Sequence, residues 1–212
     1  MSVGPPLPRF IDELEQLLVA YQPVDPVAPP ADFLALAAAA LGRLISRNSW
    51  LPPDYRRPHA DYYRQFLLYR DPASRFSVVS FVWGPGQQTP IHDHQVWGLV
   101  GIFEGAEYTQ AYRLGPDAEV GPLLIDGPAK RLQPGMVEIL SPADGDIHRV
   151  YNAFDDQVSV SIHVYGADIG AVERWVYPPD WPSSARKRFV SGYSNDPTTP
   201  PFAQRAELGV LP

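Results

Sequence analysis

Two histidines separated by one residue lie in the segment IHDHQVWG, residues 91–98. Residues two apart in a β-strand project to the same side, so an extended backbone would point the imidazoles of His92 and His94 together. Pro90 just before them favours that conformation. Two converging imidazoles are a natural chelate for iron, zinc, copper or nickel. By itself the pair is equally typical of surface or core histidines.

The chain has no cysteine among its 212 residues. A disulfide, a thiolate metal ligand and a cysteine nucleophile are therefore excluded, and any metal must bind His, Asp or Glu. A further histidine, His148, lies in GDIHRVYN, residues 145–152.

Glycines at positions 86, 98 and 105 bracket the histidine pair, and GDIHRVYN follows about fifty residues later. This order resembles the two motifs of the cupins, small β-barrels in which turn glycines surround metal-binding histidines, although Pro142 is one residue out of place. The resemblance covers roughly residues 76–165. It implies that His148 joins His92 and His94 as a third metal ligand.

Most cupins carry a glutamate ligand at the position of Gly98. Without it, three neutral imidazoles leave the 2+ charge of a metal uncompensated, so we expect an anionic substrate. Three facial ligands also leave room for a bidentate substrate and O₂, whereas zinc with a bound hydroxide would suit a hydrolase or hydratase. The offsets of Glu104 and Glu107 do not fit a cupin ligand, and we expect both to face solvent.

The segment VSVSIHVYG, residues 158–166, alternates strictly between apolar and polar side chains. Ser161, His163 and Tyr165 share one face of the expected strand. If that face lines the barrel mouth, hydroxyl, imidazole and phenol can form a hydrogen-bond chain that orients the phenol toward a metal-bound ligand. If it faces water, the segment is an ordinary half-exposed strand.

A cupin with glycine in place of glutamate and an SxHxY strand resembles the thiol dioxygenases of the cysteine dioxygenase superfamily. The resemblance implies a mononuclear Fe(II) on the three histidines, with a small thiol and O₂ as substrates and a sulfinic acid as product. It also implies that Ser161, His163 and Tyr165 form an outer-sphere triad, with Tyr165 near substrate and oxygen.

Animal cysteine dioxygenases have a cysteine cross-linked to the active-site tyrosine, which a chain without cysteine cannot form. Gln65 replaces their carboxylate-binding arginine. Both departures resemble the bacterial branch that includes 3-mercaptopropionate dioxygenases. In that branch an arginine after the SxHxY strand is a candidate partner of the substrate carboxylate, and by spacing this arginine is Arg174 here. A guanidinium binds a carboxylate bidentately. Arg64 would substitute if the register is off by one. The most favoured substrate is 3-mercaptopropionate; cysteine, cysteamine and mercaptosuccinate stay open.

Two other functions fit the same barrel. A metal-dependent isomerase or hydrolase would hold zinc or manganese on the same histidines. A metal-free sugar-binding or regulatory barrel would need none of them, so it would keep its binding when His94 is replaced by alanine.

The elements that must position these residues are two helices and a set of short strands. Apolar spacing predicts helices over residues 8–22 and 31–46, and leaves 59–69 as a helix or a helix running into a strand. Strands are predicted over 76–83, 97–103, 107–114, 136–140, 149–154, 158–165, 173–178 and 186–193. We expect a mainly β fold, one cupin domain over residues 1–212: a helical segment (1–70), a β-barrel (71–195) and a C-terminal arm (196–212).

Composition limits the partners. With 17 basic and 24 acidic residues the net charge is −7, which disfavours nucleic acid. The N-terminus lacks the pattern of a signal peptide, and the apolar run 33–42 is about half a membrane span. These features predict a cytoplasmic protein, a monomer or weak homo-oligomer, without nucleic-acid or membrane partners.

Overall fold

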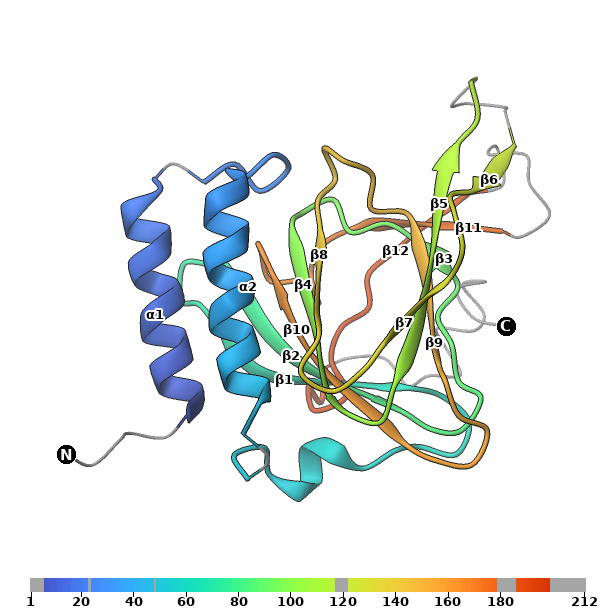
Figure 1. The fold of residues 1–212 in the computed structure, drawn as a ribbon, viewed down its shortest axis with the longest axis horizontal. Helices are drawn as coiled ribbons and strands as arrows, with labels where there is room; N and C mark the ends of the chain where they lie inside the picture. Colours follow the sequence, from blue (N-terminus) through green and yellow to red (C-terminus); the bar gives the residue numbers. More distant parts are fainter. Residues whose placement is uncertain (1–5, 23, 48, 117–121, 179–185, 199–212) are drawn as a thin grey trace.

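A computed structural model describes residues 6–22, 24–47, 49–116, 122–178 and 186–198. Two antiparallel helices come first, and two antiparallel β-sheets face each other beside them (Figure 1). The helical elements are α1 (Pro6–Ala20), α2 (Ala31–Ile45) and the single 3₁₀ turn η1 (Pro53–Arg56).

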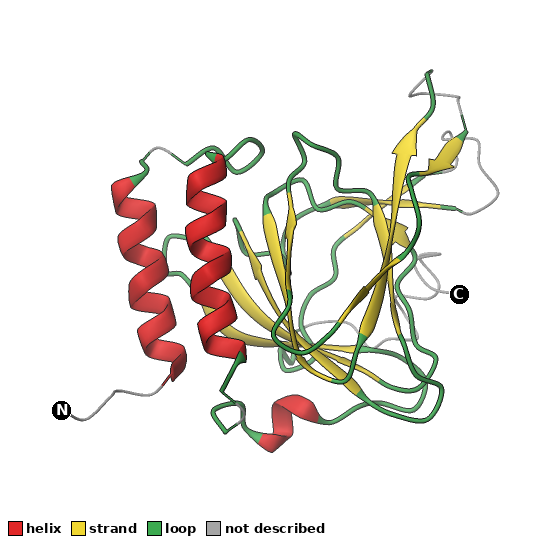
Figure 2. Ribbon diagram, in the orientation of Figure 1, coloured by secondary structure: helices red, strands yellow, loops and turns green. Residues whose placement is uncertain are grey.

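The strands are divided between the two sheets, as Figure 2 shows in yellow. The five-stranded sheet has the order β1 (Arg64–Arg70), β2 (Ser77–Trp83), β10 (Ser159–Tyr165), β4 (Gly98–Glu104) and β8 (Val137–Leu140). The seven-stranded sheet has the order β12 (Lys187–Phe189), β11 (Arg174–Tyr177), β3 (Ile91–His92), β9 (His148–Asn152), β5 (Glu107–Leu114) and β6 (Leu123–Ile125), with β7 (Lys130–Leu132) also paired to β5.

The chain alternates between these sheets from β2 to β11, except that β6 and β7 follow β5 within the seven-stranded sheet. β2, β4, β8 and β10 lie in the first sheet, and β3, β5, β9 and β11 lie in the second. A chain wound in this way forms a double-stranded β-helix, the jelly-roll barrel of cupins. The predicted fold class, mainly β with N-terminal helices, is therefore confirmed.

The helices cover the outer face of the five-stranded sheet (Figure 1). Val160, Ile162 and Val164 of β10 belong to the same buried apolar cluster as residues of both helices. Because side chains alternate along a strand, the opposite face of β10, with its serines, histidine and tyrosine, turns into the barrel. All seven residues of β10 are buried. The half-exposed alternative for this strand is wrong.

The segment 59–69, left open by its sequence, holds no α-helix. β1 starts at Arg64 and pairs antiparallel with β2, with Gln65 opposite Phe81. Of the expected C-terminal arm, residues 199–212 lie outside the described residues. No helix in the described part of the chain combines the length and apolar character needed to cross a membrane.

Candidate metal centre

The second sheet brings the three predicted ligands together. His92 on β3 lies directly opposite His148 on β9, and His94 follows two residues after His92, just beyond β3. The three ring centroids are 4.8 to 4.9 Å apart in each pair. One ring nitrogen of each lies within 4.8 Å of the others. This buried group is positioned to bind a metal ion.

Two of the rings have their outer nitrogen engaged by the protein. His92 Nδ1 lies 3.0 Å from the carbonyl oxygen of Pro90, to which an Nδ1–H donates. His148 Nδ1 lies 3.2 Å from the hydroxyl oxygen of Thr109 on β5. With the proton assigned to Nδ1, each ring keeps its Nε2 lone pair for a metal, which is how outer partners orient histidine ligands.

The third ring has a carboxylate close to its outer nitrogen. Asp146 Oδ2 accepts the backbone N–H of His94 at 2.8 Å and lies 3.3 Å from its Nδ1. His94 is fully buried, and neither of its ring nitrogens has a partner with hydrogen-bond geometry among the described residues. An unmatched buried nitrogen is costly, and a metal ion would satisfy it. The residues present therefore fit a metal.

Two of the three histidines, His92 and His148, are also in the right protonation state. Burial, together with the neighbouring His94 ring, lowers the pKa of His92 and of His148 well below 6.5. Both are neutral at pH 7, so a metal need not displace a proton from them. Burial raises the pKa of Asp146, but its contacts with His94 outweigh this and leave the pKa lowered. A full negative charge therefore lies behind the His94 ring.

Gly98 makes room for Tyr165 beside this centre. The two residues are opposite each other in the β4–β10 pairing, and a Cβ at position 98 would lie 3.1 Å from the tyrosine ring. The ring in turn stacks on His94, with centroids 5.6 Å apart. The phenol ring from the neighbouring strand thus occupies the space that a side chain at position 98 would need.

Replacing Gly98 with alanine should displace the Tyr165 ring while leaving the three histidines in place. We expect unchanged metal content and a loss of turnover on the order of tenfold to a hundredfold, because small misplacements of reacting groups have effects of that size. Metal analysis and a crystal structure of the variant test this. Gly42→Ala is the control, since its Cβ meets nothing closer than 3.9 Å. An undisplaced ring with full turnover would contradict the expectation.

A hydrogen-bond chain runs along the inner face of β10. Tyr165 Oη lies 2.8 Å from His163 Nδ1, and His163 Nε2 lies 2.8 Å from Ser161 Oγ. Trp83 donates its indole N–H to the same serine oxygen at 3.2 Å. Burial lowers the pKa of His163 and raises that of Tyr165, so both are neutral at pH 7.

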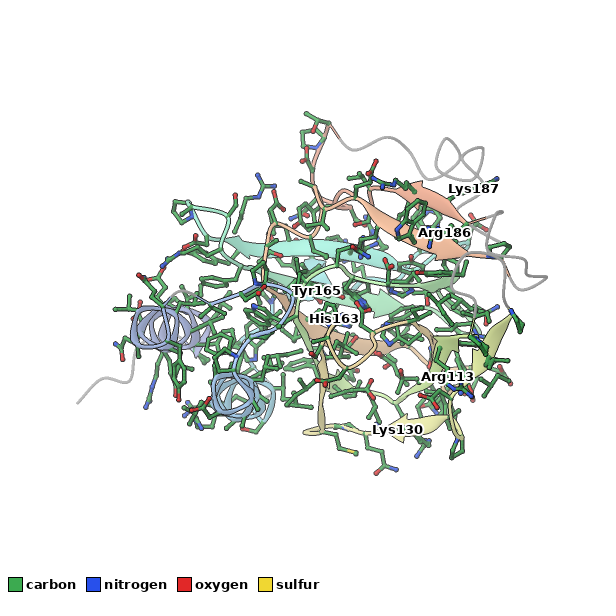
Figure 3. All side chains as sticks on the ribbon, turned by 90° about the horizontal axis from the view of Figure 1, so that it is seen from above. Arg113, Lys130, His163, Tyr165, Arg186 and Lys187 are labelled. Carbon is green, nitrogen blue, oxygen red and sulfur yellow. The ribbon has the colours of Figure 1, made fainter. Side chains whose placement is uncertain are left out.

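Figure 3 places His163 and Tyr165 in the interior of the barrel. The labelled basic residues Arg113, Lys130, Arg186 and Lys187 lie toward its periphery, at the end far from the helices.

A small pocket, with a cavity volume of about 20 Å³, lies between Tyr165 of the hydrogen-bond chain and His92 of the three-histidine group. Its lining comes from both sheets and is made of Tyr63, Gln65, Phe81, Thr89, Pro90, His92, Tyr165, Arg174 and Phe189. Both residues considered for binding a substrate carboxylate are therefore in one pocket with a predicted ligand and the phenol. None of the lining residues is acidic.

Arg174 is a buried cation that has no carboxylate in direct contact among the described residues. Only 4% of it is exposed, and its guanidinium lies over the Phe189 ring, 4.7 Å from the centroid. No carboxylate of the described residues lies within 4 Å of it; the neighbouring Glu173 pairs with Arg188 instead. Burial lowers the pKa of Arg174, although the charge of the buried Asp93 contributes to raising it, and an arginine stays charged at neutral pH. Its Nε has no hydrogen-bond partner in the described chain.

Of the two glutamates expected to face solvent, Glu104 does so, but the expectation is wrong for Glu107. Glu104 is half exposed and pairs with Arg56, as expected for a residue facing solvent. Glu107 is fully buried inside the barrel. It begins β5, on which residues 107 and 109 are the buried positions of an alternating pattern, so strand parity turns it inward with Thr109.

Sequence reasoning also passed over Asp146 and Thr109, the outer partners of two histidines. Asp146 is two residues before His148 within the second motif, and that proximity was the available signal. Thr109 could be found only by aligning β5 with β9, where Thr109 pairs with Val150.

No family model matches the chain. The fold is similar to solved structures of three bacterial proteins, and each similarity covers about half of the present chain. A conserved double-stranded β-helix protein from Klebsiella pneumoniae is 19% identical, with 55% of this chain and 87% of that chain covered and a TM-score of 0.39.

A cupin superfamily protein from Desulfitobacterium hafniense is 12% identical, covering 53% and 84% of the two chains with a TM-score of 0.40. A cupin 2 conserved barrel domain protein from Salinispora arenicola is 21% identical, covering 54% and 82% with a TM-score of 0.38. Similarity at this level says nothing about activity.

Proposed function

We propose that this protein is an Fe(II)-dependent thiol dioxygenase that converts a small thiol carboxylate, 3-mercaptopropionate, to its sulfinic acid. The proposal rests on one observation above all. A buried arginine with no carboxylate in direct contact lines the same small pocket as a histidine of the three-histidine group.

Charge supports this substrate class. Three neutral imidazoles bring no negative charge to a bound Fe²⁺, the nearby Asp146 lies behind the His94 ring, and Arg174 adds another positive charge in the same pocket. A ligand with two anionic groups neutralises both: a thiolate at the metal and a carboxylate at the guanidinium. A sugar or another neutral ligand would leave the arginine unpaired.

The pocket lining favours 3-mercaptopropionate over cysteine. The two thiols differ in the α-ammonium group of cysteine, which would be stabilised by a nearby carboxylate. No acidic residue lines the pocket. Mercaptosuccinate would bring a second carboxylate with no second cation among the lining residues.

Each residue then has a distinct role. Iron, when bound, supplies a Lewis acid that favours the thiolate and a redox centre that reacts with O₂. Arg174 holds the carboxylate and so fixes where the sulfur lies, while Gln65 offers an amide whose Oε1 has no partner in the described chain. Tyr165, held by His163 and Ser161, presents its phenol beside the reacting atoms. The apolar neighbours Phe81 and Phe189 exclude water.

Oxygen uptake over a panel of thiols tests the proposal. Iron-loaded protein should consume one O₂ per thiol and yield the sulfinic acid, with the highest kcat/KM for 3-mercaptopropionate and lower values for cysteine, mercaptosuccinate and cysteamine. If no thiol drives oxygen consumption while the metal is bound, the dioxygenase is excluded and a metal-dependent isomerase or hydrolase remains. Highest activity on cysteine would keep the chemistry but overturn the substrate.

A further inference from the structure

The buried Glu107 is not explained by metal binding or by the substrate pocket. The Ser159 hydroxyl lies 2.9 Å from Oε1 of Glu107 and 3.0 Å from the carbonyl oxygen of Glu104, so these two acceptors share its single proton. No lysine, arginine or histidine nitrogen of the described residues lies within 4 Å of the Glu107 carboxyl group. The strands that pair with β5 place Asn152 and Leu132 beside it. A carboxylate buried without a cation is costly, so the neutral groups that contact Glu107 matter for its protonation state.

Glu107 lies at the inner end of the Ser161–His163–Tyr165 chain. Its second oxygen, Oε2, is buried and has no partner with hydrogen-bond geometry. The side chains of Ser161 and Trp83 are nevertheless close enough to interact with the carboxyl group and lower its pKa. Glu107 also acts on Tyr165 at the far end of the hydrogen-bond chain, because the charge of Glu107 contributes to raising the pKa of Tyr165.

Ser161 links the carboxyl group to the imidazole, and its hydrogen-bonding capacity is limited. A hydroxyl has one proton to donate and two lone pairs to accept. One lone pair accepts the indole N–H of Trp83. The other lone pair and the single proton must be divided between Glu107 and His163. The protonation state of the carboxyl group therefore decides the direction of the whole chain.

With Glu107 protonated, its O–H donates to Ser161 and Ser161 donates to His163 Nε2. His163 then carries its proton on Nδ1 and donates to the Tyr165 oxygen, so that the phenol O–H is free to donate into the pocket. With Glu107 ionised, one proton has left to solvent and every link reverses. Ser161 donates to the carboxylate, His163 carries its proton on Nε2, and the Tyr165 O–H is drawn back toward His163 Nδ1.

We propose that Glu107 is a positioning residue that sets the direction of the Ser161–His163–Tyr165 hydrogen-bond chain and thereby whether the phenol donates into the pocket. Its protonated form orients Tyr165 as a donor. The groups that face Glu107 are Ser159 and Ser161 from β10 and Trp83 from β2; among them and its partners on β7 and β9, none is a cation.

Burial raises the pKa of Glu107 to about 8. The donor arrangement is therefore the one present at neutral pH, and it is lost as the pH rises through about 8. The effect on turnover rests on the proposed function, but the direction of the chain does not.

The tautomer of His163 reports that direction without any turnover. We suggest NMR of the full-length, zinc-loaded protein labelled with ¹⁵N-histidine, from about pH 6 to about pH 9.5, with the His163 signals assigned by a His163→Gln variant. In the wild type the proton should be on Nδ1 at low pH and move to Nε2 with a midpoint near 8. A single tautomer across the range would overturn the proposal.

Glu107→Gln is the decisive variant, because its amide N–H₂ replaces the carboxylic O–H and cannot ionise. His163 should then keep its proton on Nδ1 at every pH. The matched control is Glu104→Gln, the same change three residues earlier at a half-exposed glutamate, which should titrate as the wild type does. A switch that persists in Glu107→Gln would show that another group drives it, contrary to the proposal.

A milder variant covers the case in which Glu107→Gln does not fold. Ser159→Ala removes the hydrogen bond that stabilises the ionised carboxylate, so the midpoint should rise by about one pH unit. An unchanged or lowered midpoint would contradict the proposal. If the thiol assay fails while His163 still switches as expected, the positioning role of Glu107 stands and only the proposed reaction falls.

Discussion

Replacing His94 with alanine should abolish tight metal binding, with an affinity loss on the order of a thousandfold, because each of a few ligands contributes several kcal/mol. The residue is fully buried beside the other two histidines, and its Nε2 has no hydrogen-bond partner in the described chain. Metal titration of purified protein, with circular dichroism to verify folding, measures the effect. Turnover should disappear together with the metal.

His59→Ala is the control for removing a histidine. That side chain is partly exposed and stacks on Tyr62, away from the three-histidine group. It should bind metal as the wild type does. Wild-type metal stoichiometry and affinity in His94→Ala would mean that the three histidines are not a metal site, and a metal-free binding barrel would become the better account.

Replacing Arg174 with glutamine should lower kcat/KM for 3-mercaptopropionate by about a hundredfold, since removing one partner of a buried charge pair typically costs 2–5 kcal/mol. Thiols without a carboxylate should be converted at nearly the wild-type rate. This difference between substrates separates loss of carboxylate recognition from general damage. Steady-state oxygen consumption with both kinds of thiol provides the measurement.

Two companion variants sharpen the result. Arg174→Lys keeps the charge but loses the bidentate fork, and should recover only part of the activity. Arg188→Gln removes an exposed arginine of the neighbouring strand and should change nothing at the site. Because the wild type buries a cation with no carboxylate in direct contact, Arg174→Gln should also melt at a higher temperature than the wild type. An equal loss on all thiols would assign Arg174 a structural role.

Much of the barrel could be predicted because its signals are local. Alternation in residues 158–165 marks β10, and glycine and proline turns mark most other strands of the barrel. The strand β1 was left undecided because the segment HADYYRQFLLY carries aromatic residues compatible with either structure, and it becomes a strand only by pairing with β2. Pairing with a distant strand cannot be predicted from the sequence of one segment alone.

The candidate site could likewise be predicted where its signals are local in the sequence. Spacing and the resemblance pointed to three histidines that the structure does bring together. The inward turn of Glu107 could not be found by counting from the histidine pair, since it depends on where β5 begins after the turn at Gly105. The partners Asp146 and Thr109 likewise depend on how loops and strands from distant parts of the chain meet.

The most direct test is a crystal structure of the Fe(II)-loaded protein, prepared without oxygen and soaked with 3-mercaptopropionate. The account predicts the metal bound by one nitrogen each of His92, His94 and His148, with the substrate sulfur on the same ion and its carboxylate on Arg174. A side-chain carboxylate bonded to the ion, or a thiol that stays away from it while the ion is bound, would contradict the account.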